Sequence, residues 1–334
     1  MAGIIFSEGS GLNDSLFGKS QEPIKHVITC GMEEFERESQ LEKVYNMDTS
    51  DRYAEKYTSE TSLADFQDVG ENGAVPVSGF QEGYSKVIEA MTWKNGFSVS
   101  KEMLEDAQYG KVKRKAQNFV QSYNRTREKF GAAMLAGGIG KKVMFAGKAY
   151  DTTSADGAAL FSAEHTSITG GYGKQSNIFT AANGFSVAAM DRVEEAMQSV
   201  CDDDGNLLSV MPDTIIIPNN ALIKRAVIAA CDSEYDPESD KNAVNFQCGL
   251  WNIIVWKYLP KTLGGEPYFM MMDRKFCKNN YGLPWVDRVK LTVDSFVDHN
   301  TDANSWSGRA RFGVGFNNWR GVAICGKGLT GTTV

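Results

Sequence analysis

The sequence of 334 residues lacks several features that mark common classes of protein. No apolar run approaches the roughly 18 residues that a membrane span requires. The first residues, MAGIIFSEGSG, carry neither the basic segment nor the long apolar segment of a secretory signal. We therefore expect a protein that stays in a cytoplasm and has no membrane partner. With 42% hydrophobic residues, the chain can bury one large core or several smaller ones.

An excess of positive charge is also missing. The 35 lysine and arginine side chains are outnumbered by 42 acidic ones, which gives a formal net charge of -7 at pH 7. Such a chain produces no global positive field that would attract nucleic acid or anionic lipid. The composition therefore excludes a dedicated DNA-binding protein.

Cysteine and histidine are too scattered to indicate a metal site or a catalytic site. The 6 cysteines form no CxxC pair, so we expect free and mostly buried thiols rather than a disulfide scaffold or a zinc site. Of the 3 histidines, His165 follows an acid, Glu164, which could orient its imidazole, but no nucleophile motif such as GxSxG accompanies the pair. The sequence predicts no catalytic residue, no bound cofactor and no metal ligand.

Three glycine-containing segments resemble ligand loops only superficially. In residues 313–318, GVGFNN, the dinucleotide-binding fingerprint GxGxxG is broken by Asn318. In residues 135–143, LAGGIGKKV, Lys142 stands where a phosphate loop needs Ser or Thr. The acidic turn at residues 202–206, DDDGN, lacks the spacing of a calcium loop. We interpret the first as a strand whose glycines allow another backbone to approach, the second as a helix end and the third as a turn.

Hydrophobic periodicity predicts both helices and strands. Apolar residues recur at three- and four-residue steps over residues 101–136, which indicates one long helix that Gly110 breaks or bends near its first third. At 1.5 Å per residue, this helix would be on the order of 50 Å long. A charged segment at residues 32–45 predicts a short surface helix. Residues 1–30 are typical of an arm that becomes ordered, if at all, only through contact with something else.

The middle of the chain contains a long loop and then a regular alternation of elements. Residues 51–99 hold two runs that are compatible with strands, and a long glycine-rich segment separates them. A loop of that length in a compact domain needs a function. The middle third is predicted to be an α/β domain, with helices at residues 186–200 and 221–231 and strands at residues 214–217, 251–256 and 267–273.

The C-terminal third has a period of two residues, which is typical of strands. Residues 289–297 and 309–316 alternate apolar and polar side chains, and a polar loop at 298–308 separates them. Asparagines 317–318 predict a turn, because Asn tolerates the left-handed backbone conformation. With a last strand at 319–325, the pattern predicts a three-stranded antiparallel sheet.

Charge is segregated along the chain. Between Lys111 and Lys129, seven basic residues are accompanied by a single acid, Glu128. The ordinary interpretation is a pair of solvated faces, since exposed charges often contribute nothing measurable. The alternative is that acidic and basic elements meet between subunits and steer assembly. The acidic element is the early helix, with Glu33, Glu34, Glu36, Glu38 and Glu42.

The order of these parts and four local strings carry a family resemblance from about Tyr53 onward. The strings are WKNGFSVSKEMLEDAQYG at 93–110, DGAALFSAEHTS at 156–167, VMPDTIIIPNNA at 210–221 and RARFGVGFNNWRG at 309–321. Together they resemble the major capsid proteins of tailed phages with the Hong Kong 97-like fold, and most closely the Mu-like head subunits.

The resemblance implies an α+β fold with an N-terminal arm, an extended β-hairpin loop, a long spine helix, a peripheral-domain β-sheet and an inserted α/β axial domain. The implied divisions are residues 1–50 for the arm and short helix, 51–99 for the extended loop, 100–184 for the peripheral domain with the spine helix, 185–285 for the axial domain, and 286–334 for the peripheral-domain sheet and C-terminal tail.

The resemblance also implies a function. The chain would be a non-enzymatic subunit that self-assembles as pentamers and hexamers into an icosahedral head around double-stranded DNA, without sequence-specific binding. It would belong to the virion and assemble in the cytoplasm of a bacterial host. Implied partners are a portal protein and a decoration protein. Because only some 50 residues precede the extended loop, scaffolding would have to come from a separate protein or be unnecessary. Some members of the family join their subunits by Lys–Asn isopeptide bonds. Lys56 and Lys86 are lysines of the predicted loop region, and their presence alone does not indicate such a bond.

Two alternatives remain open from the residues. An encapsulin-type nanocompartment shares the implied fold but encloses cargo enzymes, so the contents of purified particles would distinguish it. A soluble nucleotide- or metal-dependent enzyme built on the middle domain would form a small oligomer with a stoichiometric ligand. The missing motifs count against this second alternative.

Overall fold

The chain divides into two compact units, which are described separately. The computed structural model describes residues 5–6, 17–60, 63, 66–71, 73–77, 79, 81–106, 109–182, 184–235, 244–298 and 303–333. Unit 1 consists of Met1–Glu55, Ile88–Gly131 and Trp285–Val314. Unit 2 consists of Lys56–Val87, Ala132–Pro284 and Gly315–Val334. None of the described helices has the length and apolar character needed to cross a membrane.

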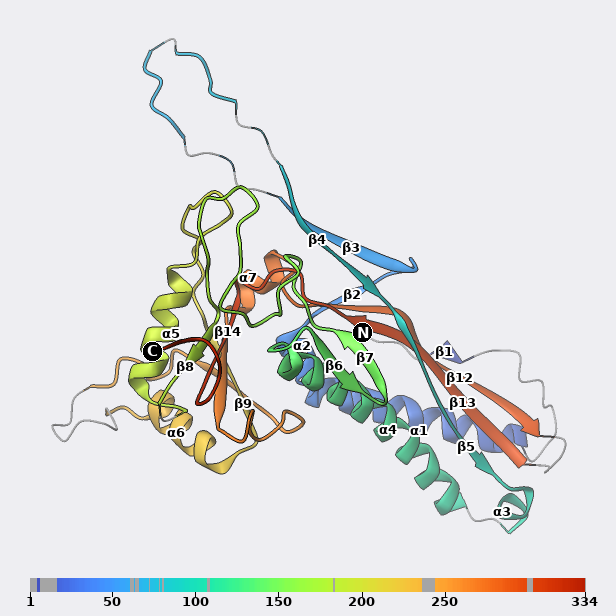
Figure 1. The fold of residues 1–334 in the computed structure, drawn as a ribbon. Helices are drawn as coiled ribbons and strands as arrows, with labels where there is room; N and C mark the ends of the chain where they lie inside the picture. The colour runs from blue at the N-terminus through green and yellow to red at the C-terminus, as the bar shows by residue number, and fades with distance from the viewer. Residues whose placement is uncertain are drawn as a thin grey trace. The chain divides into compact units, whose positions relative to one another are not determined.

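In unit 1, two long helices pack against a sheet whose strand order is β1-β12-β13-β5, with β2 also paired to β12 (Figure 1). The apolar core joins Ile28 of the first helix, Val120 of the second, and Leu291 and Trp306 of the sheet. The elements are α1 Phe17–Glu38, α2 Leu41–Val44, α3 Lys101–Glu105, α4 Tyr109–Gly137, β1 Ile5–Phe6, β2 Asn46–Thr49, β5 Met91–Val99, β12 Pro284–Asp298 and β13 Ala303–Val314.

The long helix predicted over residues 101–136 is confirmed for most of its length. It forms α4, whose 29 residues correspond to about 44 Å. The break or bend predicted near Gly110 is a break that lies a few residues earlier, between the end of α3 at Glu105 and the start of α4 at Tyr109, and Gly110 belongs to the first turn of α4. The buried residues Val112, Ala116 and Phe119 recur at the steps that the periodicity predicted.

The prediction for the N-terminal segment is wrong in one respect. Residues 7–16 of the predicted arm lie outside the described residues, but the helix that was expected from residue 32 begins at Phe17. Ile28 and Met32, four residues apart, are both buried in the unit 1 core. A Cβ at Gly31 would lie 3.1 Å from Cγ1 of Val120, so α1 packs closely on α4. Burial against α4 therefore extends the helix further toward the N-terminus than its own weak pattern indicated.

The predicted C-terminal sheet is correct for two of its three strands. β12 and β13 pair antiparallel, but the other neighbour of β13 is β5 rather than the last strand. β13 begins at Ala303, so the predicted loop at 298–308 is too long; its residues 299–302 lie outside the described residues. The last strand, β14 (Val322–Gly326), is buried at every residue because it lies between two strands of the other sheet.

The turn at Asn317 and Asn318 forms without a left-handed residue. Among the described non-glycine residues, only Ala146 and Tyr281 have positive φ. Instead, the side-chain oxygen of Asn318 accepts a hydrogen bond of 3.1 Å from the backbone nitrogen of Arg320. A side chain that imitates a backbone turn replaces the expected left-handed conformation.

Unit 2 contains a six-stranded mixed sheet with the order β10-β9-β11-β14-β8-β15. The helices and strands predicted for the middle third are confirmed, and the side chains of Ser186 and Asn220 cap α5 and α6 as N-cap residues do. The elements are β6 Lys142–Phe145, β7 Lys148–Asp151, β8 Ile178–Thr180, α5 Val187–Gln198, β9 Thr214–Pro218, α6 Ala221–Asp232, β10 Asn252–Trp256, β11 Tyr268–Met272, α7 Arg274–Asn279, β14 Val322–Gly326 and β15 Thr332–Thr333.

The two strand-compatible runs of residues 51–99 form a separate two-stranded ladder, β3 (Ala54–Glu60) with β4 (Glu82–Glu89) (Figure 1). The described residues between β3 and β4 belong to no helix or strand. Several of them expose apolar side chains almost completely, including Phe66 and Val77. These side chains are not packed against any other described part of the chain.

Candidate assembly surfaces and buried polar clusters

The histidine that the sequence singled out, His165, is fully buried in unit 2. Its Nδ1 lies 2.6 Å from Oδ2 of Asp156, and its Nε2 lies 3.2 Å from Oδ1 of Asn177. Its ring stacks on Trp319 with centroids 4.0 Å apart. The expected partner Glu164 instead pairs with a lysine at the surface. A substrate could not reach the buried imidazole, so His165 is part of the core rather than a catalytic base.

The proton positions on His165 follow from its neighbours. The side-chain nitrogen of Asn177 donates to the carbonyls of Leu160 and Val322, at 2.7 and 3.1 Å. The Asn177 oxygen is therefore an acceptor, and Nε2 of His165 must donate to it. Burial would raise the pKa of Asp156, but the hydrogen bond from His165 and its charge outweigh this effect and lower that pKa. Nε2 of His165 thus donates to Asn177, and Nδ1 faces the carboxylate of Asp156.

A second buried ion pair fixes the acidic turn. One guanidinium nitrogen of Arg320 lies 3.1 Å from Oδ1 of Asp203 and donates to the hydroxyl of Tyr172 at 3.1 Å. Burial, only partly offset by the charge of Arg320, raises the pKa of Tyr172 to about 12. Asp202 accepts from the backbone nitrogens of Asp204 and Asn206, which confirms the predicted turn at 202–206. These acids hold the turn together and leave no ring of oxygens for a cation.

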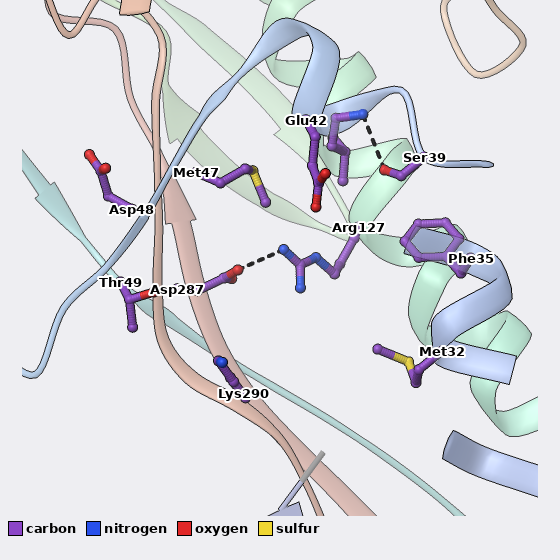
Figure 2. A pocket seen from close by; sticks show the side chains of 11 residues that line it. Met32, Phe35, Ser39, Glu42, Met47, Asp48, Thr49, Arg127, Asp287 and Lys290 are labelled. Carbon is purple, nitrogen blue, oxygen red and sulfur yellow. Dashed lines mark hydrogen bonds and ion pairs between the residues drawn. The ribbon is translucent and has the colours of Figure 1, made fainter. Parts of the chain in front are cut away.

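Unit 1 contains a polar cavity of about 160 Å³ between α1, β2, α4 and β12 (Figure 2). Arg127 reaches into it, and its guanidinium lies 2.8 Å from Oδ2 of Asp287 and 3.1 Å from the hydroxyl of Tyr123. The guanidinium also lies 5.1 Å from the ring centre of Trp285. The next residue of α4, Glu128, accepts hydrogen bonds from the hydroxyl of Ser39 and the backbone nitrogen of Gln40, just after the end of α1. These buried charges connect α4 to β12 and to the turn between α1 and α2.

The cysteines do not form a site. All six are free, and Cys231, Cys277 and Cys325 are buried while Cys30 is exposed, so the expectation of mostly buried thiols holds for half of them. Burial raises the pKa of the Cys231 and Cys325 thiols to about 12, which keeps them protonated and unreactive. Within the described ranges, no group of three or more His, Cys, Asp or Glu side chains is placed to hold a metal ion.

The glycine of the C-terminal strand has a steric role. A Cβ built at Gly313 would lie 2.4 Å from the backbone oxygen of Glu89, so another backbone does approach it, as predicted. Gly137 and Gly138 lie at the end of α4 and are packed by Val143 and Leu160, which agrees with a helix end rather than a phosphate loop.

We expect Gly313→Val to lower the free energy of unfolding by about 1–3 kcal/mol, because the added carbons overpack a strand that is held on both sides by β12 and β5. Chemical denaturation of the unassembled protein measures this change. Gly110→Ala is the matched control, because a Cβ there meets nothing within 4 Å. Equal stability of Gly313→Val and the unmodified protein would contradict the steric role.

Exposed apolar side chains concentrate in two places. One is the segment between β3 and β4, and the other is α6 with the turn that follows it, where Leu222 is 77% exposed, Val244 82% and Phe246 68%. Single exposed apolar residues are ordinary, but groups of them mark surfaces that another molecule covers. Both groups belong to unit 2.

Comparison with known proteins gives one family. A sequence model described as "Phage capsid protein" matches residues 83–325. No curated protein sequence is significantly similar to the chain. Among solved structures, one of Mycobacterium phage Patience is 12% identical with a TM-score of 0.53, covering 99% of this chain and 95% of that chain.

Two further structures have the same fold over most of their length. One, of Mycobacterium phage Adephagia, is 15% identical with a TM-score of 0.52, and 87% of this chain and 91% of that chain are covered. The other is the capsid of a native GTA particle, which is 12% identical with a TM-score of 0.52, covering 86% and 89% of the two chains. At such low identity these likenesses establish the α+β, Hong Kong 97-like fold.

Proposed function

Because this chain belongs to the phage capsid protein family, we propose that it is the major head subunit of a tailed bacteriophage or prophage and that its copies form an icosahedral shell around double-stranded DNA. The observation that carries this proposal is the extent of the family match, which includes α4 and reaches from β4 to β14. The family is one of structural proteins rather than enzymes. The buried position of His165 supports this assignment.

We assign the parts of the subunit as the family resemblance implies. The proposed divisions are the arm and first helices at 1–50, the extended loop at 51–99, the peripheral domain at 100–184 and 286–334, and the axial domain at 185–285. Exposed apolar residues between β3 and β4, such as Phe66, support a loop that lies over a neighbouring copy. The exposed apolar residues of α6 and its following turn support contacts of the axial domain with other copies.

We infer the partners from the same role. Copies of the chain would contact one another as pentamers and hexamers, and a portal protein, a separate scaffolding protein and a decoration protein would complete the head. Assembly would take place in the cytoplasm of the bacterial host, and the finished subunit would belong to the virion. A net charge of -7 supports enclosure of DNA without tight binding, since like charges repel. We also propose a likeness to Mu-like head subunits, for which the string RARFGVGFNNWRG is the support.

Electron microscopy of the purified protein tests the proposal. We expect closed shells several times wider than a single subunit, either with the protein alone or after co-expression with the neighbouring genes of its source. Only monomers or dimers under both conditions, across salt and protein concentration, would contradict it. Shells that contain enzymes instead of DNA when isolated from the source would identify a nanocompartment instead.

A further inference from the structure

One exposed face of α4 is basic along most of the helix. Its members recur at three- and four-residue steps, contain no acid, and lie on the side opposite the buried residues Val112, Ala116 and Phe119. At 1.5 Å per residue, the face is about 27 Å long. We call it the basic stripe, and it consists of Lys111, Arg114, Asn118, Gln121, Arg125 and Lys129.

The charges of the basic stripe have no counterpart among the described residues of the chain. None of its four cationic side chains takes part in an ion pair with another described residue. Other bases of this segment are used internally: Lys115 donates to the carbonyl of Ser98 at 2.8 Å, and Arg127 pairs with Asp287. Together with the exposed Lys113, the stripe is therefore a part of the basic segment that forms no ion pair with a described residue, in a chain whose net charge is -7.

The outward face of α1 carries the opposite charge. Glu33, Glu34 and Glu38 are exposed with Arg37 among them, and none of the three acids forms an ion pair with a described residue. We call these three acids the acidic patch. The inward face of α1 packs on α4 through Ile28 and Met32 (Figure 1). Two helices in contact thus present a basic and an acidic surface, each directed away from their shared core.

We propose that the basic stripe of one subunit binds the acidic patch of a second copy of this chain. The inference rests on the proposed function, because a shell brings identical copies side by side. Since the stripe and the patch occupy different places on the same subunit, the contact is head-to-tail and can repeat from copy to copy around a closed ring. Opposite charges on such surfaces accelerate encounter and select the register, and they act over about 8–10 Å at moderate salt.

Charge exchange tests this contact. The first variant reverses the stripe, the second reverses the patch, and the third combines both and restores the net charge. We expect each single reversal to slow shell formation at least tenfold, measured by light scattering and counted by electron microscopy, and the combined variant to recover most of the loss. The reversals are Lys111→Glu, Arg114→Glu and Arg125→Glu in the stripe, and Glu33→Lys, Glu34→Lys and Glu38→Lys in the patch.

A matched control separates the contact from net charge and from unfolding. Reversal of three exposed bases outside the stripe changes the net charge equally and should leave the assembly rate within about twofold, because local charges dominate encounter. The substitutions lie on exposed faces, and Glu and Lys have similar helix propensities, so circular dichroism should show folded subunits. The control variant is Lys142→Glu, Lys148→Glu and Lys275→Glu, three exposed bases that lie neither on the stripe nor on α6.

The outcomes distinguish this contact from the proposed function. If the unmodified protein forms shells and the combined variant stays as slow as the single reversals, the contact is wrong and the function stands. If stripe reversal leaves assembly normal and only lowers the DNA content of the particles, the stripe binds nucleic acid instead. If the unmodified protein never forms shells under the conditions given above, the proposed function itself is contradicted.

Discussion

Replacing Arg127 by Met is expected to lower the free energy of unfolding by about 3–5 kcal/mol, because it leaves the carboxylate of Asp287 buried without its partner. The Arg127 side chain is 8% exposed and that of Asp287 is 15% exposed, so water screens the pair little. Burial would lower the pKa of Arg127, but Tyr123 and Asp287 raise it above its ordinary value, which keeps the guanidinium charged. Urea denaturation of the unassembled subunit measures the loss.

A double-mutant cycle isolates the pair from the rest of the cavity. Asp287→Asn keeps an oxygen for the indole nitrogen of Trp285, which lies 3.0 Å from Oδ1 of Asp287. The double substitution should therefore cost less than the sum of the two single ones, by at least 1 kcal/mol on the usual scale for contacting charges. Arg125→Met is the matched control and should change stability by less than about 0.5 kcal/mol, since Arg125 is exposed. Strictly additive losses would contradict a coupled pair.

The sequence predicted those elements whose pattern is both long and local. The 3.6-residue period of α4 and the capped start of α6 after Asn220 needed no information from elsewhere in the chain, and both are confirmed. By contrast, α1 contains Pro23 and a weak apolar pattern, and it is stabilised by contacts with α4 through Ile28 and Met32. Local propensity does not contain such long-range burial.

Strand pairing was the part that the sequence could not determine. A period of two shows that a strand has one buried face, but it does not say which strand lies beside it. β14 continues directly from β13 along the chain, and yet it pairs with β11 and β8, while β5, some 200 residues earlier than β13, takes the expected place. The all-buried residues Val322–Gly326 were the available signal, because a central strand of a covered sheet has no polar face.

The candidate polar residues show the same limit. Adjacency in sequence suggested Glu164 as the partner of His165, whereas the partner is Asp156, nine residues earlier, brought in by the turn that the isolated pairing of Thr153 with Ala159 defines. The Arg127–Asp287 pair joins positions 160 residues apart and has no sequence signal at all. The residue spacing indicated only that common catalytic, cofactor and metal-binding motifs are missing. The predicted function came from the family resemblance.

Removing the Asp156 carboxylate should destabilise unit 2 in a pH-dependent way. At pH 7, Asp156→Ala leaves Nδ1 of the buried His165 without its hydrogen-bond partner at 2.6 Å and is expected to cost about 2–3 kcal/mol. Asp156→Asn should cost less, because an amide offers both a donor and an acceptor and so can keep a hydrogen bond to Nδ1 of His165. The order Ala, then Asn, then Asp in rising stability is therefore the expected result.

The direction of the pH effect follows from the lowered pKa of Asp156. A carboxylate whose pKa is lower in the folded than in the unfolded state stabilises the fold fully above the unfolded value, about 3.9, and loses that contribution as the pH falls through the folded value. The contribution of the Asp156 carboxylate to the stability difference between the unmodified protein and Asp156→Ala should thus be present in full at pH 7 and shrink below about pH 4. Denaturation curves across this range, with Glu164→Gln as the control at a fully exposed acid, measure it. A difference that persists unchanged at pH 3, or no difference at pH 7, would show that His165 does not hold the carboxylate ionised. The contact that joins these segments of unit 2 would then be a neutral hydrogen bond.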